Sequence, residues 1–328
     1  MSGGITNFSP SGVQAPFFIG SNFMTQGNTW FVKPYSGSDG NSGKTPYRAF
    51  KTLAKALASA TANRNDIIYF FAESNTGSGT TDYFSAATDW NKDMVHLVGI
   101  NAGGMIGQRS RIAQLSTIKT VENLLTISAD GCLIANLEVF QGVASSTATS
   151  PVAVTVSGQR NHIVNCQLSG NGDTGGSMDT AGARSLVLSG SENLFEKCYI
   201  GLDTVIRGTQ AAEVALSGSP TRNVFKDCII NSYTSSTSFL PVTVAATMDR
   251  FTIFENCKFL CSENITSAAT PDVVFGGSIT TINGVIHLVN PYTNCTQYAP
   301  DSTRVKALGN NGLATGHLVG ISQTIDAA

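Results

Sequence analysis

Four cysteines recur at nearly constant spacing, each within a similar phrase. Cys166, Cys198, Cys228 and Cys257 are 32, 30 and 29 residues apart, in the phrases NHIVNCQL, NLFEKCYI, NVFKDCII and TIFENCKF. A fifth phrase, CLIANLEV, places Leu137 in the cysteine column. A period near 30 residues that is rich in β-branched and aromatic side chains indicates one supersecondary unit stacked on itself as a solenoid.

A second phrase keeps the same period upstream of these. It is a short apolar run closed by small residues, in six copies: LLTIS ending at Ser128, VAVTVSG at 152–158, SLVLSG at 185–190, EVALSG at 213–218, PVTVAA at 241–246 and DVVFGG at 272–277. These runs indicate buried strands, because none keeps a helical period. No stretch long enough for a crossover helix separates them. The repeat therefore contains at least two strands, each pairing with its copy one turn later.

The residues around the cysteine column predict a sharp bend just before it. The preceding position holds Asn136, Asn165, Lys197, Asp227 and Asn256. Apolar residues stand three positions before the column and two after it: Ile134, Ile163, Phe195, Phe225, Phe254, Val139, Leu168, Ile200, Ile230 and Phe259. These side chains and the column cannot all point inward from one straight strand, since strand side chains alternate. Asn and Asp tolerate the left-handed conformation of such a bend, whereas Lys197 implies strain or a different turn.

With these phrases, residues 95–290 resemble the right-handed parallel β-helix proteins of the pectate-lyase-like superfamily, in which an asparagine ladder marks a tight bend between two sheets. The resemblance implies an all-β fold, a right-handed parallel β-helix. It implies little about chemistry, because this scaffold hosts lyases, hydrolases and non-enzymes. We expect an extended N-terminal arm at 1–28, a strand, loop and short capping α-helix at 29–66, the β-helix at 67–300 and a C-terminal tail at 301–328.

The first 60 residues suggest a cap and an arm. The arm carries the apolar segment APFFIGSNFM, which either covers the bottom of the solenoid or docks on another subunit or a larger particle. A helix expected at 49–60 places Phe50, Leu53, Ala54 and Leu57 on one face. The SDGNSGKTP loop before it has Asp39 as its one acid, which favours a turn-rich loop over a calcium or phosphate site. This module resembles that of phage β-helix proteins, including tailspikes and virion surface proteins.

Composition excludes several classes of partner. The formal net charge is −2 and only 13% of residues are charged, without a cluster of Lys or Arg, which argues against a nucleic-acid-binding surface. No apolar run approaches the length of a membrane span, and the N-terminus does not read as a signal peptide, so we expect synthesis in a cytoplasm.

Seven cysteines, an odd number, do not suggest a disulfide framework. The four in the column are interpreted as small buried hydrophobes. A metal site is the alternative, weakened by the absence of a CxxC pair and by the scatter of the four histidines. Cys261 and Cys295 lie outside the ladder and are open to exposure.

Three stretches leave the repeat, at 141–150, 169–183 and 232–240, and they carry two acids, Asp173 and Asp179. Loops of this kind emerge on one side of a β-helix and can form a binding face. Glu196 and Glu255 stand two rungs apart, about 9.6 Å by rung spacing, close to the separation of a glycosidase pair. Lys226 between them favours an ordinary surface ladder. We therefore predict no catalytic, cofactor-binding or metal-ligating residue.

These features and the resemblance together imply a non-enzymatic bacteriophage structural protein that decorates or cements the capsid surface. The resemblance alone implies that it is a homotrimer. The arm would bind the major capsid protein or another virion protein, and no cofactor, nucleic acid or membrane is expected. The alternative is a tailspike-type polysaccharide depolymerase, or a spike that binds a host surface glycan. A secreted pectate lyase ranks third, because calcium ligands and a signal peptide are missing.

Overall fold

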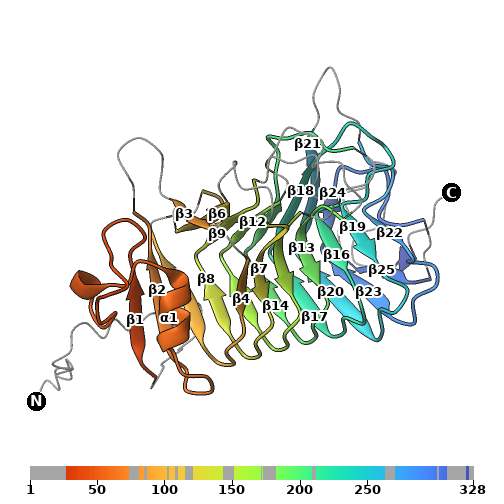
Figure 1. Cartoon of the computed structure of the whole chain (residues 1–328). Helices are drawn as coiled ribbons and strands as arrows, with labels where there is room; N and C mark the ends of the chain where they lie inside the picture. The colour runs from red at the N-terminus through yellow and green to blue at the C-terminus, as the bar shows by residue number, and fades with distance from the viewer. Residues whose placement is uncertain are drawn as a thin grey trace, which may run out of the picture.

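The computed structural model describes residues 27–73, 81–84, 87–101, 103–107, 110–114, 121–142, 151–170, 172, 182–208, 212–262, 270–300, 303–308 and 323–324. Most of the predicted arm, and both Asp173 and Asp179, lie outside these residues. Over the described residues the chain coils into a right-handed parallel β-helix (Figure 1), as the repeat predicts. Within the same residues, no helix is long and apolar enough to cross a membrane.

Three parallel sheets run along the solenoid, and each turn of the chain adds one strand to each sheet. The eleven-stranded sheet has the order β1 (Thr29–Val32), β2 (Ile67–Phe71), β5 (His96–Ile100), β8 (Leu133–Ala135), β11 (His162–Val164), β14 (Leu194–Glu196), β17 (Asn223–Lys226), β20 (Phe251–Glu255), β23 (Val285–Val289), β25 (Val305–Leu308) and β26 (Gln323–Thr324). Within this sheet the pair β25–β26 is antiparallel.

The two other sheets complete each turn. The eight-stranded sheet contains β3 (Thr81–Phe84), β6 (Arg111–Gln114), β9 (Glu138–Phe140), β12 (Gln167–Ser169), β15 (Tyr199–Gly201), β18 (Ile229–Tyr233), β21 (Lys258–Ser262) and β24 (Tyr292–Thr293). The seven-stranded sheet contains β4 (Thr88–Trp90), β7 (Asn123–Ile127), β10 (Val152–Val156), β13 (Arg184–Leu188), β16 (Val214–Leu216), β19 (Val242–Val244) and β22 (Phe275–Gly277). The six apolar phrases of the sequence supply the last six strands of this sheet.

The predicted bend lies between the eleven-stranded and eight-stranded sheets. All five residues before the column are left-handed, with φ between 51° at Lys197 and 58° at Asn136. The Asn165 side-chain amide donates to Asn136 Oδ1 at 2.8 Å, one rung away. Lys197 adopts the same conformation, so the alternative of a different turn is wrong. Its ammonium lies 3.7 Å from the Glu196 carboxylate.

Apolar ladders fill the interior as predicted. The rings of Phe195, Phe225 and Phe254 stack with centroids 4.6 Å apart and nearly parallel planes. The four thiols of the cysteine column are fully buried, and burial raises the pKa of the Cys166 thiol to about 12. Each column thiol donates to a backbone carbonyl, as Cys228 Sγ does to the Phe195 oxygen.

Cys261 and Cys295 are also buried, so the suggestion that these two thiols are exposed is wrong. Cys261 belongs to β21, at an inward position of the strand, and Cys295 packs in the same core. The sequence could not show this, because both lie outside the repeated phrase.

A second ladder, which the sequence analysis missed, closes the corner between the seven-stranded and eleven-stranded sheets. Asn161, Asn193 and Asn223 are buried and stand five positions before the cysteine column. The backbone amide of Asn161 donates to Asn193 Oδ1, and that of Asn193 donates to Asn223 Oδ1, both at 2.9 Å. Their side-chain amides donate to carbonyls of the rung below, as Asn193 does to the Gly158 oxygen. This ladder satisfies backbone groups that the turn would otherwise bury unpaired.

The N-terminal helix is shorter than predicted. α1 spans Leu53–Ser59, and it buries Leu53, Ala56 and Leu57. Ala54 is exposed, so its assignment to the buried face is wrong. The Asp39 carboxylate accepts hydrogen bonds from the backbone amides of Lys51 and Thr52, both at 2.9 Å, and from the Thr52 hydroxyl. The loop therefore uses its acid to hold the start of the helix.

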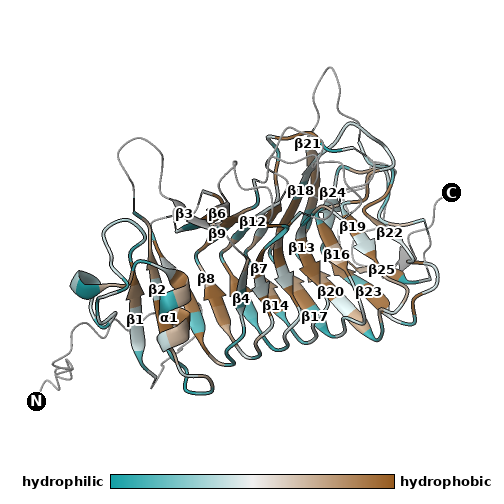
Figure 2. Cartoon of the chain, in the orientation of Figure 1, coloured by the Kyte–Doolittle hydropathy of each residue, from teal (hydrophilic) through white to brown (hydrophobic). Residues whose placement is uncertain are grey.

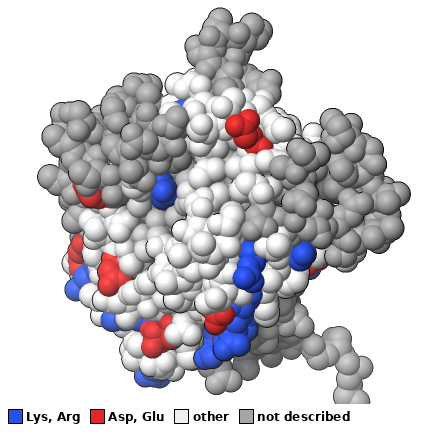
Figure 3. All heavy atoms as spheres, turned by 90° about the vertical axis from the view of Figure 1, so that its right-hand side faces the viewer, with Lys and Arg blue, Asp and Glu red and all other residues white. Residues whose placement is uncertain are grey.

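The C-terminal end of the solenoid presents a weakly charged surface. Figure 3 looks at this end and shows mostly uncharged described atoms, with acidic and basic side chains interspersed near the lower edge. This agrees with the low share of charged residues, 13%.

We predict that Phe225→Ala destabilises the protein by about 3–5 kcal/mol, because it leaves a cavity between two stacked rings. Lys226→Ala is the matched control, because Lys226 directly follows Phe225 and its side chain points to solvent. For this variant we expect a change within about 0.5 kcal/mol. Urea unfolding of both variants measures the difference. Equal stability losses in the two variants would contradict the stacked ladder.

A second prediction concerns acid stability. Burial lowers the pKa of His96 from 6.5 to about 4, although the negative charge of Asp66 opposes this shift. The neutral ring accepts from the Leu133 amide at Nδ1, a hydrogen bond that a protonated ring cannot make. Protons therefore bind the unfolded chain more readily, so stability is lost as the pH falls from 6.5 towards 4.

We expect His96→Gln to remove much of this acid-dependent loss, which is about 3 kcal/mol at most. His287→Gln, at an exposed position, is the control and leaves the profile unchanged. Unfolding curves across this pH range provide the measurement, and identical profiles for His96→Gln and the parent chain would refute the assignment.

Candidate functional site

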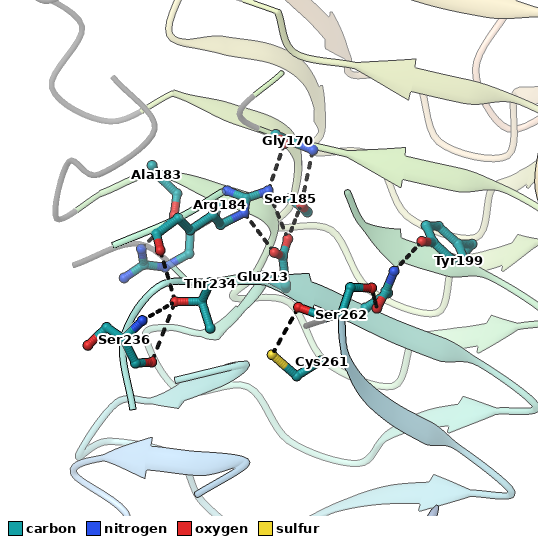
Figure 4. A network of polar contacts seen from close by, with 12 residues as sticks. Gly170, Ala183, Arg184, Ser185, Tyr199, Glu213, Thr234, Ser236, Cys261 and Ser262 are labelled. Carbon is teal, nitrogen blue, oxygen red and sulfur yellow. Dashed lines mark hydrogen bonds and ion pairs between the residues drawn. The ribbon is translucent and has the colours of Figure 1, made fainter. Parts of the chain in front are cut away.

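A buried polar network lies at the third corner of the solenoid, where the chain passes from the eight-stranded to the seven-stranded sheet. From β8 onwards the other two corners are short, but the connections here are long: 201 to 214 between β15 and β16, and 233 to 242 between β18 and β19. Figure 4 shows residues from successive turns of the solenoid at this corner. We call the group Arg184, Ser185, Tyr199, Asp203, Arg207 and Glu213 the corner network.

A fully buried ion pair forms its centre. Arg207 lies in the connection after β15, and Glu213 immediately precedes β16. Both side chains are 0% exposed, and Arg207 Nε lies 2.8 Å from Glu213 Oε1. Arg207 Nη2 donates to Glu213 Oε2 at 3.1 Å and to the Gly170 oxygen at 2.8 Å. The guanidinium thereby links two turns of the solenoid.

The Glu213 carboxylate also binds the preceding rung. The Ser185 hydroxyl donates to Glu213 Oε2 at 2.6 Å and accepts from the Gly170 amide at 2.9 Å. Burial raises the pKa of Glu213, although Arg207 and Ser185 oppose that shift. A carboxylate this enclosed cannot reach a ligand in this conformation, so its role is to hold the residues around it.

Arg184 is the partly exposed cation of the corner network. It begins β13, and its Nη1 donates to the Ala183 oxygen at 2.6 Å. Burial lowers its pKa, while the nearby charges of Glu213 and Arg207 pull in opposite directions. The guanidinium still remains charged, because its unperturbed pKa is so high. Arg184, Arg207 and Glu213 together carry two positive charges and one negative charge, which leaves one positive charge uncompensated within this trio.

A phenol and an exposed acid adjoin this trio: Tyr199 lies on β15, and Asp203 lies in the connection that follows it. The Tyr199 oxygen accepts from Asn231 Nδ2 at 2.6 Å. Burial, together with the charges of Asp203 and Glu213, raises the pKa of Tyr199 to about 12. Tyr199 therefore keeps its proton at neutral pH and can donate it in a hydrogen bond. Asp203 itself is exposed.

The corner network thus combines three kinds of group: a guanidinium that can bind a carboxylate, an exposed carboxylate that can accept a proton, and a buried phenol that can donate a hydrogen bond. Such a combination suits an anionic ligand that carries hydroxyl groups. Buried charges in an otherwise apolar solenoid cost desolvation energy, and they are found preferentially at functional sites.

The acidic pair considered from the sequence lies elsewhere. Glu196, Lys226 and Glu255 occupy one outward column of the eleven-stranded sheet, in register on β14, β17 and β20. The Lys226 ammonium lies 3.8 Å from the Glu255 carboxylate, and His162 Nε2 lies 3.2 Å from that of Glu196. The three charges form a surface ladder, as the ordinary interpretation predicts.

The three predicted insertions are only partly confirmed as loops. All three begin at the third corner, but Ser169 ends β12, and Ser232 and Tyr233 belong to β18. The connection at 202–213 is a further excursion that the sequence analysis missed, and it carries Asp203, Arg207 and Glu213. One sequence signal could have pointed to these residues: Arg184 and Glu213 each place a charge directly before or at the start of an apolar strand phrase.

Metal ligation has no support in the part of the chain that the structure describes. No group of three or more His, Cys, Asp or Glu side chains there could hold a metal ion.

Comparison with known proteins gives similarity at the level of structure. No family model matches the sequence, and no curated protein matches it. Among solved structures, a rhamnogalacturonan lyase is 15% identical with a TM-score of 0.57, covering 81% of this chain and 68% of that chain. Pectin methylesterase PemA from Erwinia chrysanthemi is 15% identical with a TM-score of 0.54, covering 90% and 92%. Pectate lyase Pel9A is 14% identical with a TM-score of 0.55, covering 86% and 68%.

These neighbours confirm the pectate-lyase-like parallel β-helix, and at such identity they establish the fold alone. They also require a correction. The expectation of a protein without enzymatic activity is contradicted, because the similar structures are named as two lyases and an esterase. The sequence analysis searched for paired carboxylates on regular strands and in three insertions. The buried charges lie instead around a fourth connection, at 202–213.

We predict that Arg207→Met alone destabilises the protein by about 3–5 kcal/mol, because it leaves the Glu213 carboxylate buried without its partner. The double variant Arg207→Met, Glu213→Leu should recover most of this loss, since both charges are removed together. Denaturant unfolding of the single and double variants makes the comparison. Additive losses would show that the two side chains do not form an energetically coupled pair.

Proposed function

We propose that this chain binds and cleaves an acidic, uronate-containing polysaccharide at the corner network. The observation that carries the proposal is the placement of the partly exposed Arg184 near the buried Arg207–Glu213 pair, with the phenol of Tyr199 on β15 and the exposed Asp203 in the connection that follows β15. This is the alternative function considered from the sequence, a depolymerase or glycan-binding β-helix.

A partly exposed cation favours an anionic sugar. Arg184 and Arg207 balance the carboxylates of Glu213 and Asp203, and Arg184 is the partly exposed cation that a sugar carboxylate can approach. A guanidinium can bind a carboxylate through two parallel hydrogen bonds, and such charge-assisted bonds are stronger than neutral ones. Because Arg207 is fully buried, Arg184 is the guanidinium of this trio that can meet a sugar.

The site also contains groups that can move a proton. Cleavage of a glycosidic bond, by elimination or by hydrolysis, needs a positioned base or acid. Asp203 is exposed and can accept a proton, while Tyr199 retains its proton and can donate a hydrogen bond to a sugar oxygen. The similar structures support this class of substrate, since they are named for pectate, pectin and rhamnogalacturonan.

The place of the protein in its biological setting remains a prediction from the sequence. A position on a phage virion, a homotrimer and attachment through the arm are consistent with a tailspike-type depolymerase. Locating the chain on an intact particle would test these three expectations.

Incubation of the purified chain with a panel of acidic and neutral polysaccharides tests the proposal. We expect shortened products from acidic polymers, detected as new reducing ends by a colorimetric assay, with unsaturated uronate ends if the bond breaks by elimination. Arg184→Met should lower kcat/KM or affinity by about tenfold to a hundredfold, the equivalent of one lost charge-assisted hydrogen bond. Asp203→Asn should lower kcat more than affinity.

Arg160→Met is the matched control. Arg160 is an exposed arginine at the opposite corner, where it pairs with Glu192 at 2.6 Å, so its loss should leave activity unchanged. Failure of the parent chain to bind or cleave any acidic polymer would refute the proposal. Equal effects of the Arg184 and Arg160 substitutions would reject the corner network as its site.

A further inference from the structure

The outward surface of the eleven-stranded sheet is apolar over its first five strands. On β2, Ile68 and Phe70 belong to the interior core, so Tyr69 between them points outward, because successive strand side chains alternate. The same alternation on β1, β5, β8 and β11 gives an outward group that we call the outer apolar face: Phe31, Ile67, Tyr69, Phe71, Val98, Ile100, Leu133, Ala135 and Val164. In Figure 2, β1, β2 and β8 are brown over much of their length, consistent with apolar residues on both surfaces.

Along one outward column this face ends at β11. That column runs in register from Ala135 through Val164 to Glu196, and it continues with Lys226 and Glu255. The neighbouring outward column continues with the partly buried Leu194, Val224 and Ile253. The fully buried part of the outward surface is therefore confined to the first five strands, and a contiguous apolar area of this extent marks a surface that is covered.

Within a single chain the outer apolar face is already buried. Ala135 is 0% exposed, Val98 2% and Val164 5%. Among the residues that the structure describes, the buried cluster contains only Ala49 beyond the five strands, and one alanine cannot cover them. A sheet surface stays open to water unless something lies on it, so this face needs an occupant.

The sequence narrows the choice of segment. β1 is the first strand of this sheet, and the chain that leads into it contains Ala15–Met24, APFFIGSNFM, with no charged side chain before Lys33. The stretch 74–80 that follows β2 reads SNTGSGT and has no apolar side chain to offer. The connections at the third corner join the eight-stranded and seven-stranded sheets, so they neither begin nor end on the sheet that carries this face.

The dimensions also agree. Five strands span about 19 Å across the sheet, from four spacings of about 4.8 Å. Ten residues in extended form reach about 33 Å, which is enough to cross the face and return to β1 through 25–28. We propose that Ala15–Met24 packs across the outer apolar face as an intramolecular cover. This refines the sequence expectation that the arm covers the solenoid, and it assigns the cover to a side of the solenoid and not to its bottom.

Limited proteolysis of the full-length protein tests the proposal without any substitution. Chymotrypsin cleaves after Phe17, Phe18 and Phe23 if the segment is free. We expect cleavage at these sites to be at least tenfold slower than in a synthetic peptide of residues 10–28, a difference of about 1.4 kcal/mol or more. Cleavage at the peptide's rate would overturn the proposal.

Two full-length variants provide a second measurement. Phe18→Ser should expose the outer apolar face and increase the fluorescence of bound ANS several-fold, because this dye reports accessible apolar surface. Phe8→Ser, in the same arm but outside the apolar segment, is the matched control and should leave the fluorescence unchanged. Equal responses of the two variants would overturn the proposal. So would light scattering that shows Phe18→Ser dissociating an oligomer, because the occupant would then belong to a second copy.

Discussion

A left-handed residue at the first corner of each turn determines the geometry of this solenoid. The bend between the eleven-stranded and eight-stranded sheets consists of two residues, and the first has a φ of +51° to +58° in five successive turns. Such a bend costs little for Asn and Asp, whose short polar side chains tolerate it, and more for Lys197. Because the bend is so short, the register of each rung follows from that of the previous one. The stacked phenylalanines and thiols behind it depend on that register.

The second corner also turns through a left-handed residue, at Arg160, Glu192, Arg222 and Arg250, and it adds a second ladder; the third corner has neither ladder. Buried asparagines at 161, 193 and 223 pass hydrogen bonds from rung to rung along the second corner. Insertions at either of these corners would break a ladder. From β8 onwards the long connections lie at the third corner, and the polar groups that they carry meet there; the two earlier turns have long connections at the first corner, at 72–80 and 101–110. The scaffold thus concentrates chemical variation along one edge while its interior remains apolar.

The sequence predicted the scaffold well because the repeat reports it directly. Phrases such as NLFEKCYI contain the inward ladder, the bend residue and the outward charges at fixed positions. Asn193 stood in the same phrase and was overlooked, since its role appears only when its side chain is seen beneath the next turn. Ala54 was assigned to the buried face because Phe50, which lies outside the helix, was counted as part of its apolar stripe.

The candidate site was harder to predict, because it depends on contacts that do not repeat. Arg207 and Glu213 are six residues apart, yet each also binds Gly170 or Ser185 of the preceding turn. Nothing in the phrase VIRGTQAAEV shows that its charges are buried. Cys261 and Cys295 were misjudged for the same reason, since burial outside a repeat is a property of the whole fold. Within the repeat, the burial of a side chain can be inferred from the other copies. Outside the repeat, burial depends on tertiary contacts that the sequence does not show.

The most direct measurement is a crystal structure of the full chain with a bound acidic oligosaccharide. We expect a sugar carboxylate at the Arg184 guanidinium and the adjacent glycosidic oxygen within reach of Asp203 and Tyr199. Binding along the charged ladder of Glu196, Lys226 and Glu255, or the absence of sugar from the third corner at saturating concentration, would contradict this view of the protein.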